Sequence, residues 1–70
     1  MSKIIKGKLY TNPLGLIVKA TSNSDGANFD GILIEDPNND YPHYLNKNSK
    51  FWNTYYFEEY NPNNDLFPIY

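Results

Sequence analysis

The sequence predicts an all-β domain, a small barrel of four to five short antiparallel strands with a long loop and an aromatic C-terminal tail. Short runs rich in β-branched and aromatic residues alternate with turn signals made of Asn, Asp, Gly and Pro. Helical periodicity is weak along the whole chain. Because 70 residues make one domain, residues 1–70 are treated as a single unit.

The first two strands are predicted at residues 3–10 and 16–21. Gly7 interrupts the first strand and indicates a bulge or a close backbone approach. The sequence Asn-Pro-Leu-Gly at 12–15 predicts a turn, since Pro presets the bend and Gly supplies a positive φ. Residues 3–21 are therefore expected to form a hairpin. One face of the second strand carries Leu16, Val18 and Ala20.

The third strand is predicted at residues 29–35, after a polar loop at 22–28. Alternation puts Ile32 and Ile34 on one face. The other face carries Phe29, Gly31 and Leu33. Apolar residues on both faces predict a central strand that is buried on both sides.

The second half of the chain begins with a long polar connection, predicted at residues 36–50. Connections of this length in small domains are often functional. A short helical turn is expected at 51–53 and a fourth strand at 54–60. The tail, residues 61–70, ends in four apolar residues out of five and is expected to dock on its own barrel or on a neighbouring subunit. Closure into an SH3-like barrel would remove exposed sheet edges.

The composition argues against catalysis and against a bound cofactor or metal. The chain has no Cys and no Arg, and His43 is its only imidazole. One His without a thiolate cannot complete a zinc site. Asp36, Asn38 and Asp40 alternate like the start of a calcium loop, but the pattern lacks the required Gly and Glu further on, so an Asx turn is expected instead. We therefore expect no enzyme activity, no catalytic residues and no metal.

The charge pattern argues against duplex nucleic acid and against a membrane. The net charge is −2 and all six cations are Lys, whereas duplex binders usually show a basic, Arg-containing face. The chain has no apolar run approaching the ~20 residues of a membrane helix. The N-terminus lacks the pattern of a signal segment, which favours a cytoplasmic location.

Aromatic residues are the best functional candidates. Seven Tyr, four Phe and one Trp exceed what one small core can enclose, and Tyr and Trp are favoured at interfaces. The predicted binding patch consists of Tyr41, Tyr44, Trp52, Tyr55 and Tyr56. Three interpretations stay open at this point: ordinary surface tyrosines around a core, a protein interface, and a pocket that stacks a flat ligand.

A sparse set of positions resembles short uncharacterised proteins encoded by phages and prophages. The resemblance covers residues 6–58 and is carried by Gly7-x-x-Tyr10, Gly15-x-x-Val18, Asn28-Phe29-x-Gly31, Tyr41-Pro42, Trp52 and Phe57. It implies a phage context, in the cytoplasm of a bacterial host, and an SH3-like barrel. It carries over no catalytic residues. Small phage proteins often act by binding, for example by blocking host proteins, sequestering nucleotide signals or serving in the virion.

Three functions are accordingly predicted. In the first, the aromatic patch masks a host defence or regulatory protein. In the second, a homo-oligomer sequesters a small nucleotide-like signal between its rings, with phosphates bound by Lys6, Lys8, Lys19, Lys47 or Lys50. The third is a structural role in virion assembly, based on the tail and on self-association.

Overall fold

The computed structural model describes residues 3–24 and 26–61, and this part of the chain is all-β. Five strands and two single-turn 3-10 helices follow one another along the chain. They are β1 (Leu9–Thr11), β2 (Ile17–Ala20), β3 (Asn28–Glu35), η1 (Pro42–Tyr44), β4 (Asn48–Asn53), η2 (Thr54–Tyr56) and β5 (Glu58–Glu59). The all-β prediction is confirmed.

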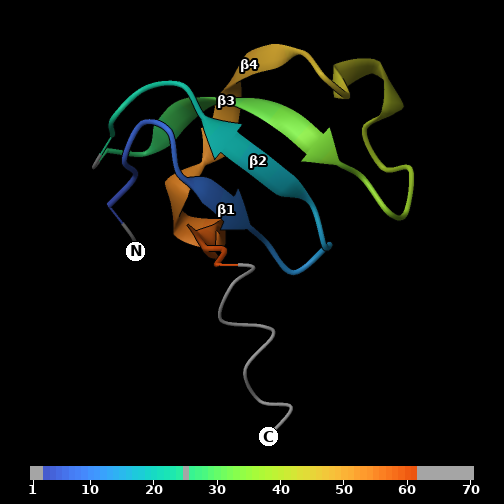
Figure 1. Ribbon diagram of the computed structural model, residues 1–70, viewed down its shortest axis with the longest axis horizontal. Helices are drawn as coiled ribbons and strands as arrows, with labels where there is room; N and C mark the ends of the chain where they lie inside the picture. Colours follow the sequence, from blue (N-terminus) through green and yellow to red (C-terminus); the bar gives the residue numbers. More distant parts are fainter. Residues whose placement is uncertain (1–2, 25, 62–70) are drawn as a thin grey trace, which may run out of the picture.

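The five strands form one antiparallel sheet in the order β4-β3-β2-β1-β5. The chain passes from one edge of this sheet to the other through η2 alone, which requires a strongly curved sheet (Figure 1). β4 and β5 remain the two edges, and no strand pairing joins them within the described residues. The structure therefore establishes a curved, open five-stranded sheet.

The predicted first strand is shorter than expected. Lys6 and Gly7 form a turn, and β1 begins only at Leu9. Gly7 has a φ of +92°, a backbone conformation that favours glycine. A Cβ at this position would meet nothing within 4 Å. Glycine is therefore favoured here by the backbone conformation and not by close packing. Before the turn, Ile4 is held by a short bridge to Ser24.

The turn between the first two strands is confirmed. Gly15 has a φ of +83°, and its N–H donates to the Asn12 carbonyl at 2.9 Å. The Asn12 side-chain oxygen accepts from the Leu14 and Leu16 N–H groups, each at 3.1 Å. The predicted inner face of β2 is also confirmed, since Leu16, Val18 and Ala20 are all buried.

β3 is central, as predicted, but only one of its faces is buried. Phe29, Gly31 and Leu33 face the core, whereas Ile34 on the opposite face is 38% exposed. No second layer covers that opposite face in the described part of the chain, because the sheet curves around a single core on its concave side. The expectation of burial on both faces was therefore wrong.

The assignments for residues 48–56 were wrong because strand and turn are exchanged, whereas Glu58–Glu59 form β5 within the predicted fourth strand. Residues 48–53 form β4, and residues 54–56 form the 3-10 turn η2. Asn53 caps η2 by accepting from the Tyr55 N–H at 2.8 Å. Thr54 is fully buried, and its hydroxyl donates to the Gly26 carbonyl at 2.6 Å. These two contacts turn the chain at the point where a continuous strand was expected.

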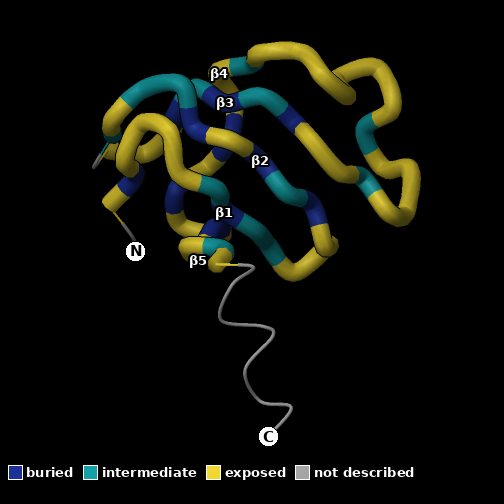
Figure 2. The backbone as a smooth tube through the Cα atoms, viewed as in Figure 1, coloured by how far each residue is buried: buried dark blue, intermediate teal, exposed yellow. Residues whose placement is uncertain are grey.

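The core lies on the concave side of the sheet, and Figure 2 marks the buried residues along the backbone in dark blue. Its apolar members are Ile4, Tyr10, Leu16, Val18, Ala20, Phe29, Leu33, Trp52 and Phe57. Gly31 permits the closest approach, because a Cβ there would overlap the Val18 side chain and lie 3.3 Å from the Phe29 ring. The Trp52 indole N–H donates to the Gly31 carbonyl at 3.0 Å, so the largest core side chain is also satisfied as a donor.

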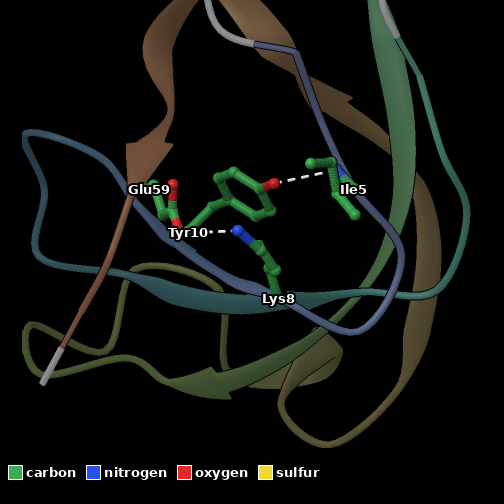
Figure 3. Close-up of polar contacts among 4 residues, drawn as sticks. All are labelled: Ile5, Lys8, Tyr10 and Glu59. Atoms are coloured by element: carbon green, nitrogen blue, oxygen red, sulfur yellow. Dashed lines mark hydrogen bonds and ion pairs between the residues drawn. The ribbon is translucent and has the colours of Figure 1, made fainter. Parts of the chain in front are cut away.

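Tyr10 connects the core to the N-terminal segment. Its hydroxyl oxygen accepts from the Ile5 N–H at 2.8 Å, as Figure 3 shows. Nearby, Lys8 and Glu59 form an ion pair at 3.2 Å across β1 and β5. Both charged side chains are about half exposed, so this pair contributes little to stability.

The predicted tail falls almost entirely outside the described residues, which end at Asn61. Within the ranges 3–24 and 26–61, no helix is long and apolar enough to span a membrane.

Candidate functional site

The described residues form a pocket of about 390 Å³. Ligand pockets in proteins commonly have volumes of about 300–1,000 Å³. The β1–β2 turn, the β3–β4 loop, the end of β4 and η2 surround it. Its lining residues are Asn12, Pro13, Leu14, Leu16, Tyr41, Phe51, Trp52, Asn53, Tyr56 and Phe57. Half of them are aromatic, so we refer to this site as the aromatic pocket.

A β-bulge in β4 brings two neighbouring rings into the pocket. Phe29 and Gly31 on β3 pair with Trp52 and Ser49 on β4, so two residues of β4, Lys50 and Phe51, lie opposite one residue of β3, Asp30. The additional residue breaks the alternation of side chains, and bulges of this kind redirect side chains near sites. As a result, the Phe51 and Trp52 rings stack, with centroids 4.5 Å apart and planes inclined by 27°.

The β3–β4 loop holds the third ring of the pocket in position. Both carboxylate oxygens of Asp36 accept backbone hydrogen bonds, from the Asp40 and Tyr41 N–H groups, each at 2.8 Å. The Asn38 side chain donates to the Leu14 carbonyl at 3.2 Å and joins this loop to the opposite wall. Tyr41 packs edge-on against Trp52, with centroids 6.1 Å apart. The pocket is thus preorganised by hydrogen bonds in the two loops that flank it.

Around the pocket, four large rings of the described residues are exposed. We call them the exposed rings: Tyr44, Phe51, Tyr55 and Tyr56. Tyr44 packs against Phe51 at 4.9 Å between centroids, and Tyr55 packs edge-on against Tyr56 at 5.2 Å. These two pairs flank the pocket, one from the β3–β4 loop and the other from η2.

The five residues of the predicted binding patch lie at different depths. Tyr41, Trp52 and Tyr56 line the pocket. Tyr44 adjoins it through Phe51, whereas Tyr55 contacts only Tyr56 among the aromatic rings that the structure describes. Trp52 is only 2% exposed and belongs to the core, so it contributes one wall of the pocket.

Sequence reasoning missed Phe51, which is 44% exposed and stacks on Trp52. It also missed Pro13 and Leu14 in the β1–β2 turn. The sequence contains a turn signal for the latter two, but no local pattern brings that turn near Trp52. Phe51 is exposed because of the β4 bulge, and the bulge depends on pairing with β3.

Besides the hydroxyls of Tyr41 and Tyr56, the pocket lining includes the side-chain amides of two asparagines, Asn12 and Asn53, on different walls. The Asn12 oxygen accepts from Leu14 and Leu16, and the Asn53 oxygen accepts from Tyr55. Their oxygens are therefore engaged, and no acceptor for either amide nitrogen is found among the described residues. Each NH₂ group can donate to a carbonyl oxygen.

The lysines proposed to bind phosphate do not line the pocket. Its lining contains no charged residue from the described ranges. All five of these lysines are exposed: Lys6, Lys8, Lys19, Lys47 and Lys50. The structure thus separates the cations from the aromatic pocket, which favours an uncharged ligand.

The other chemical candidates have structural roles or are exposed. Asp36 accepts from backbone N–H groups four and five residues further along its own loop, a longer-range contact than the expected Asx turn. His43 is exposed in η1. No group of three or more His, Asp or Glu residues is placed to hold a metal within residues 3–24 and 26–61.

Comparisons of this chain with protein-family models, with curated proteins and with solved structures found no match.

Proposed function

We propose that this protein is a non-enzymatic binding module that holds an extended, apolar segment of a partner protein in its aromatic pocket. The observation that carries the proposal is the pocket itself: five aromatic side chains surround about 390 Å³, and exposed rings flank it. Monomeric proteins rarely leave clustered large rings exposed without a binding role. Such rings are typical anchors of protein interfaces.

Two features favour a polypeptide over a nucleotide. The amide groups of Asn12 and Asn53 can donate to the backbone carbonyls of an extended segment, while the aromatic walls accept its side chains. Phosphates need cations, and the lining contains none from the described residues. A peptide-like ligand therefore matches both the aromatic walls and the two amide groups of the pocket.

We further propose that the fold is an SH3-like barrel. The strand order β4-β3-β2-β1-β5 supports this assignment, as does the single 3-10 turn between the two edge strands. In the phage context implied by the resemblance, the partner is a host defence or regulatory protein that the module masks in the bacterial cytoplasm. The absence of Cys and Arg, together with the exposed position of His43, supports a non-enzymatic role.

The proposal is tested by affinity capture from the bacterial cells that carry the gene, followed by native mass spectrometry. Phe51→Thr removes an exposed ring of the pocket and keeps a residue suited to a strand. We expect it to reduce capture of the host polypeptide roughly tenfold or more, as for a central aromatic anchor.

Ile34→Thr is the matched control, because it replaces an exposed apolar strand residue that does not line the pocket. It should leave capture unchanged. Equal capture by wild type and Phe51→Thr would contradict the proposal. So would a retained small molecule of a few hundred daltons in place of a polypeptide.

A further inference from the structure

We propose that the partner segment is acidic beyond the pocket and pairs as an added strand with the outer edge of β4, while its apolar residues enter the aromatic pocket. The inference rests on the proposed function and deepens it, because it names the binding mode and the chemistry of the partner. It concerns a surface outside the pocket, so it can fail while the pocket remains the binding site.

β4 provides an open sheet edge of six residues (Figure 1). It pairs with β3 on one side, and none of the residues that the structure describes pairs with it on the other. An open edge presents unpaired N–H and C=O groups to which an extended segment can bond. The opposite edge, β5, is less suited because it has only two residues, both of them glutamates. An added strand is therefore expected at β4.

The open edge leads directly into the aromatic pocket at Asn53, which ends β4 and also lines the pocket. The Thr54 N–H donates to the Ala27 carbonyl, and Asn53 is paired with Asn28. Because successive N–H groups of an edge strand point alternately towards its neighbour and away from it, the Asn53 N–H points away from β3. It has no acceptor within the described ranges, so it can donate to a partner carbonyl.

The surroundings of β4 are cationic, although the chain as a whole is acidic. The net charge is −2, yet residues 41–57 contain two lysines, Lys47 and Lys50, and no Asp or Glu. Both lysines are exposed, and the one ion pair found in the described part of the chain involves neither of them. Asp30 lies opposite the bulge on β3 but forms no ion pair with Lys50. Both cations can therefore meet carboxylates of a partner.

The same charges argue against a second copy of this chain as the occupant of the edge. Antiparallel pairing of two β4 strands would bring the lysines of both copies together, and like charges on paired strands are destabilising. Edge lysines and bulges are also means by which proteins avoid pairing with themselves. An acidic partner makes these lysines attractive, so the edge can discriminate between a copy and a partner.

The geometry also indicates the length and the order of the partner segment. Six residues of β4 span about 20 Å at roughly 3.3 Å per residue, so a segment of about eight to ten residues would cover both the edge and the pocket. Its apolar end would lie against Phe51 and Trp52, because the described lining carries no charge. Its acidic end would lie beside Lys50 and Lys47.

The test uses a library of random peptides of roughly twelve residues, displayed on yeast, as the probe for the full-length protein. We expect the enriched peptides to combine a short apolar or aromatic run with Asp or Glu residues on one side of it. Enrichment of peptides without acidic residues would overturn the proposal, as would the absence of any enriched peptide. Affinities of one enriched peptide, made synthetically, are then measured by isothermal titration calorimetry.

Strand pairing is tested by methylating the backbone nitrogens of this peptide one at a time. A methyl group removes the donor and prevents close approach of the two strands. Only alternate residues of a paired strand direct their N–H groups at the neighbour, so affinity should fall roughly tenfold or more at every second position of the acidic part. Unchanged affinity at every position of that part would overturn the proposal.

The acidic contact is tested by the double variant Lys47→Glu/Lys50→Glu. We expect about tenfold weaker binding and the loss of most of its salt dependence. The control is Lys3→Glu/Lys6→Glu, which makes the same change in net charge with exposed lysines ahead of β1, a strand that β2 and β3 separate from β4. The control should change affinity by no more than about twofold. Equal losses in both double variants would reduce the effect to net charge and overturn the proposal.

Phe51→Thr distinguishes failure of this inference from failure of the proposed function. Loss of peptide binding in Phe51→Thr, with no effect of Lys47→Glu/Lys50→Glu or of methylation, would keep the pocket and overturn the added strand. Binding that depends on the two lysines and on alternate backbone nitrogens but not on Phe51 would contradict the proposed function and leave the strand at β4 in place.

Discussion

Phe51 and Trp52 are neighbours in β4 and their rings stack, yet they belong to two regions with different roles. Trp52 is 2% exposed, packs in the core and donates to Gly31. Phe51 is 44% exposed and lies at the rim of the aromatic pocket. In an unbroken strand, two neighbours would point to opposite faces, and their rings could not stack.

The difference between these two residues shows how the protein builds a binding surface on a small core. The β4 bulge places one ring where it stabilises the fold and the next ring where a partner can reach it. Residues of the core should therefore affect stability when changed, and the exposed rings should affect binding. The predictions that follow test this division, beginning with the largest effect.

Trp52→Ala should unfold most of the protein. Truncating a buried Trp costs about 3–5 kcal/mol, and the Gly31 carbonyl would lose its partner. Small domains have little more stability than this. Urea denaturation followed by far-ultraviolet circular dichroism measures the loss. Trp52→Phe is the control and should retain most of the stability; a fully stable Trp52→Ala would place Trp52 outside the core.

Gly31→Ala should destabilise the fold by about 1–3 kcal/mol, because the added methyl group overlaps the Val18 side chain. The measurement is a double-mutant cycle with Val18→Ala, which opens space at the same point. We expect the double variant to be more stable than the sum of the single effects predicts. Strict additivity would show that the two positions do not compete for space.

Thr54→Val should cost about 1 kcal/mol, because it removes the hydroxyl that donates to the Gly26 carbonyl while keeping the shape of the side chain. Gly26 is exposed, so water can replace part of this bond. Thr54→Ser keeps the hydroxyl and serves as the comparison in chemical denaturation. If Thr54→Val were as stable as wild type, packing and the backbone hydrogen bond from the Thr54 N–H to the Ala27 carbonyl would be enough to hold η2 against the β2–β3 loop.

Phe51→Thr should have the smallest effect on stability, within about 0.5 kcal/mol, because the side chain is largely exposed. The same variant should show the largest loss of partner capture. Thermal unfolding monitored by Trp52 fluorescence measures the first effect. A large loss of stability would assign Phe51 to the core and remove the division between the two regions.

Sequence reasoning succeeded where local chemistry decides the structure. The turn at residues 12–15 has a Pro, a Gly with positive φ and an Asn that caps it. The inner face of β2 follows directly from alternation. The predicted excess of aromatic residues is also visible, as four rings are exposed in the described part of the chain. In these examples, the residues responsible are close together in the chain.

The same reasoning failed where distant residues decide. Tyr, Phe and Thr favour a strand at 54–60, but Asn53 caps a 3-10 turn there and Thr54 is held by Gly26 in another part of the chain. Because η2 does not alternate like a strand, Tyr55 and Tyr56 are both exposed and Phe57 returns to the core. Propensity is a weak guide when tertiary contacts compete with it.

By itself, the sequence determined the all-β class, the β1–β2 turn, the apolar face of β2 and the poverty of catalytic groups, because each depends on residue type and local spacing. Only the tertiary structure decided which rings would be buried and which would form a pocket. That choice depends on the bulge that pairing with β3 imposes on β4 and on the curvature that brings β5 beside β1. Both arise from contacts between residues far apart in the chain, which no local pattern records.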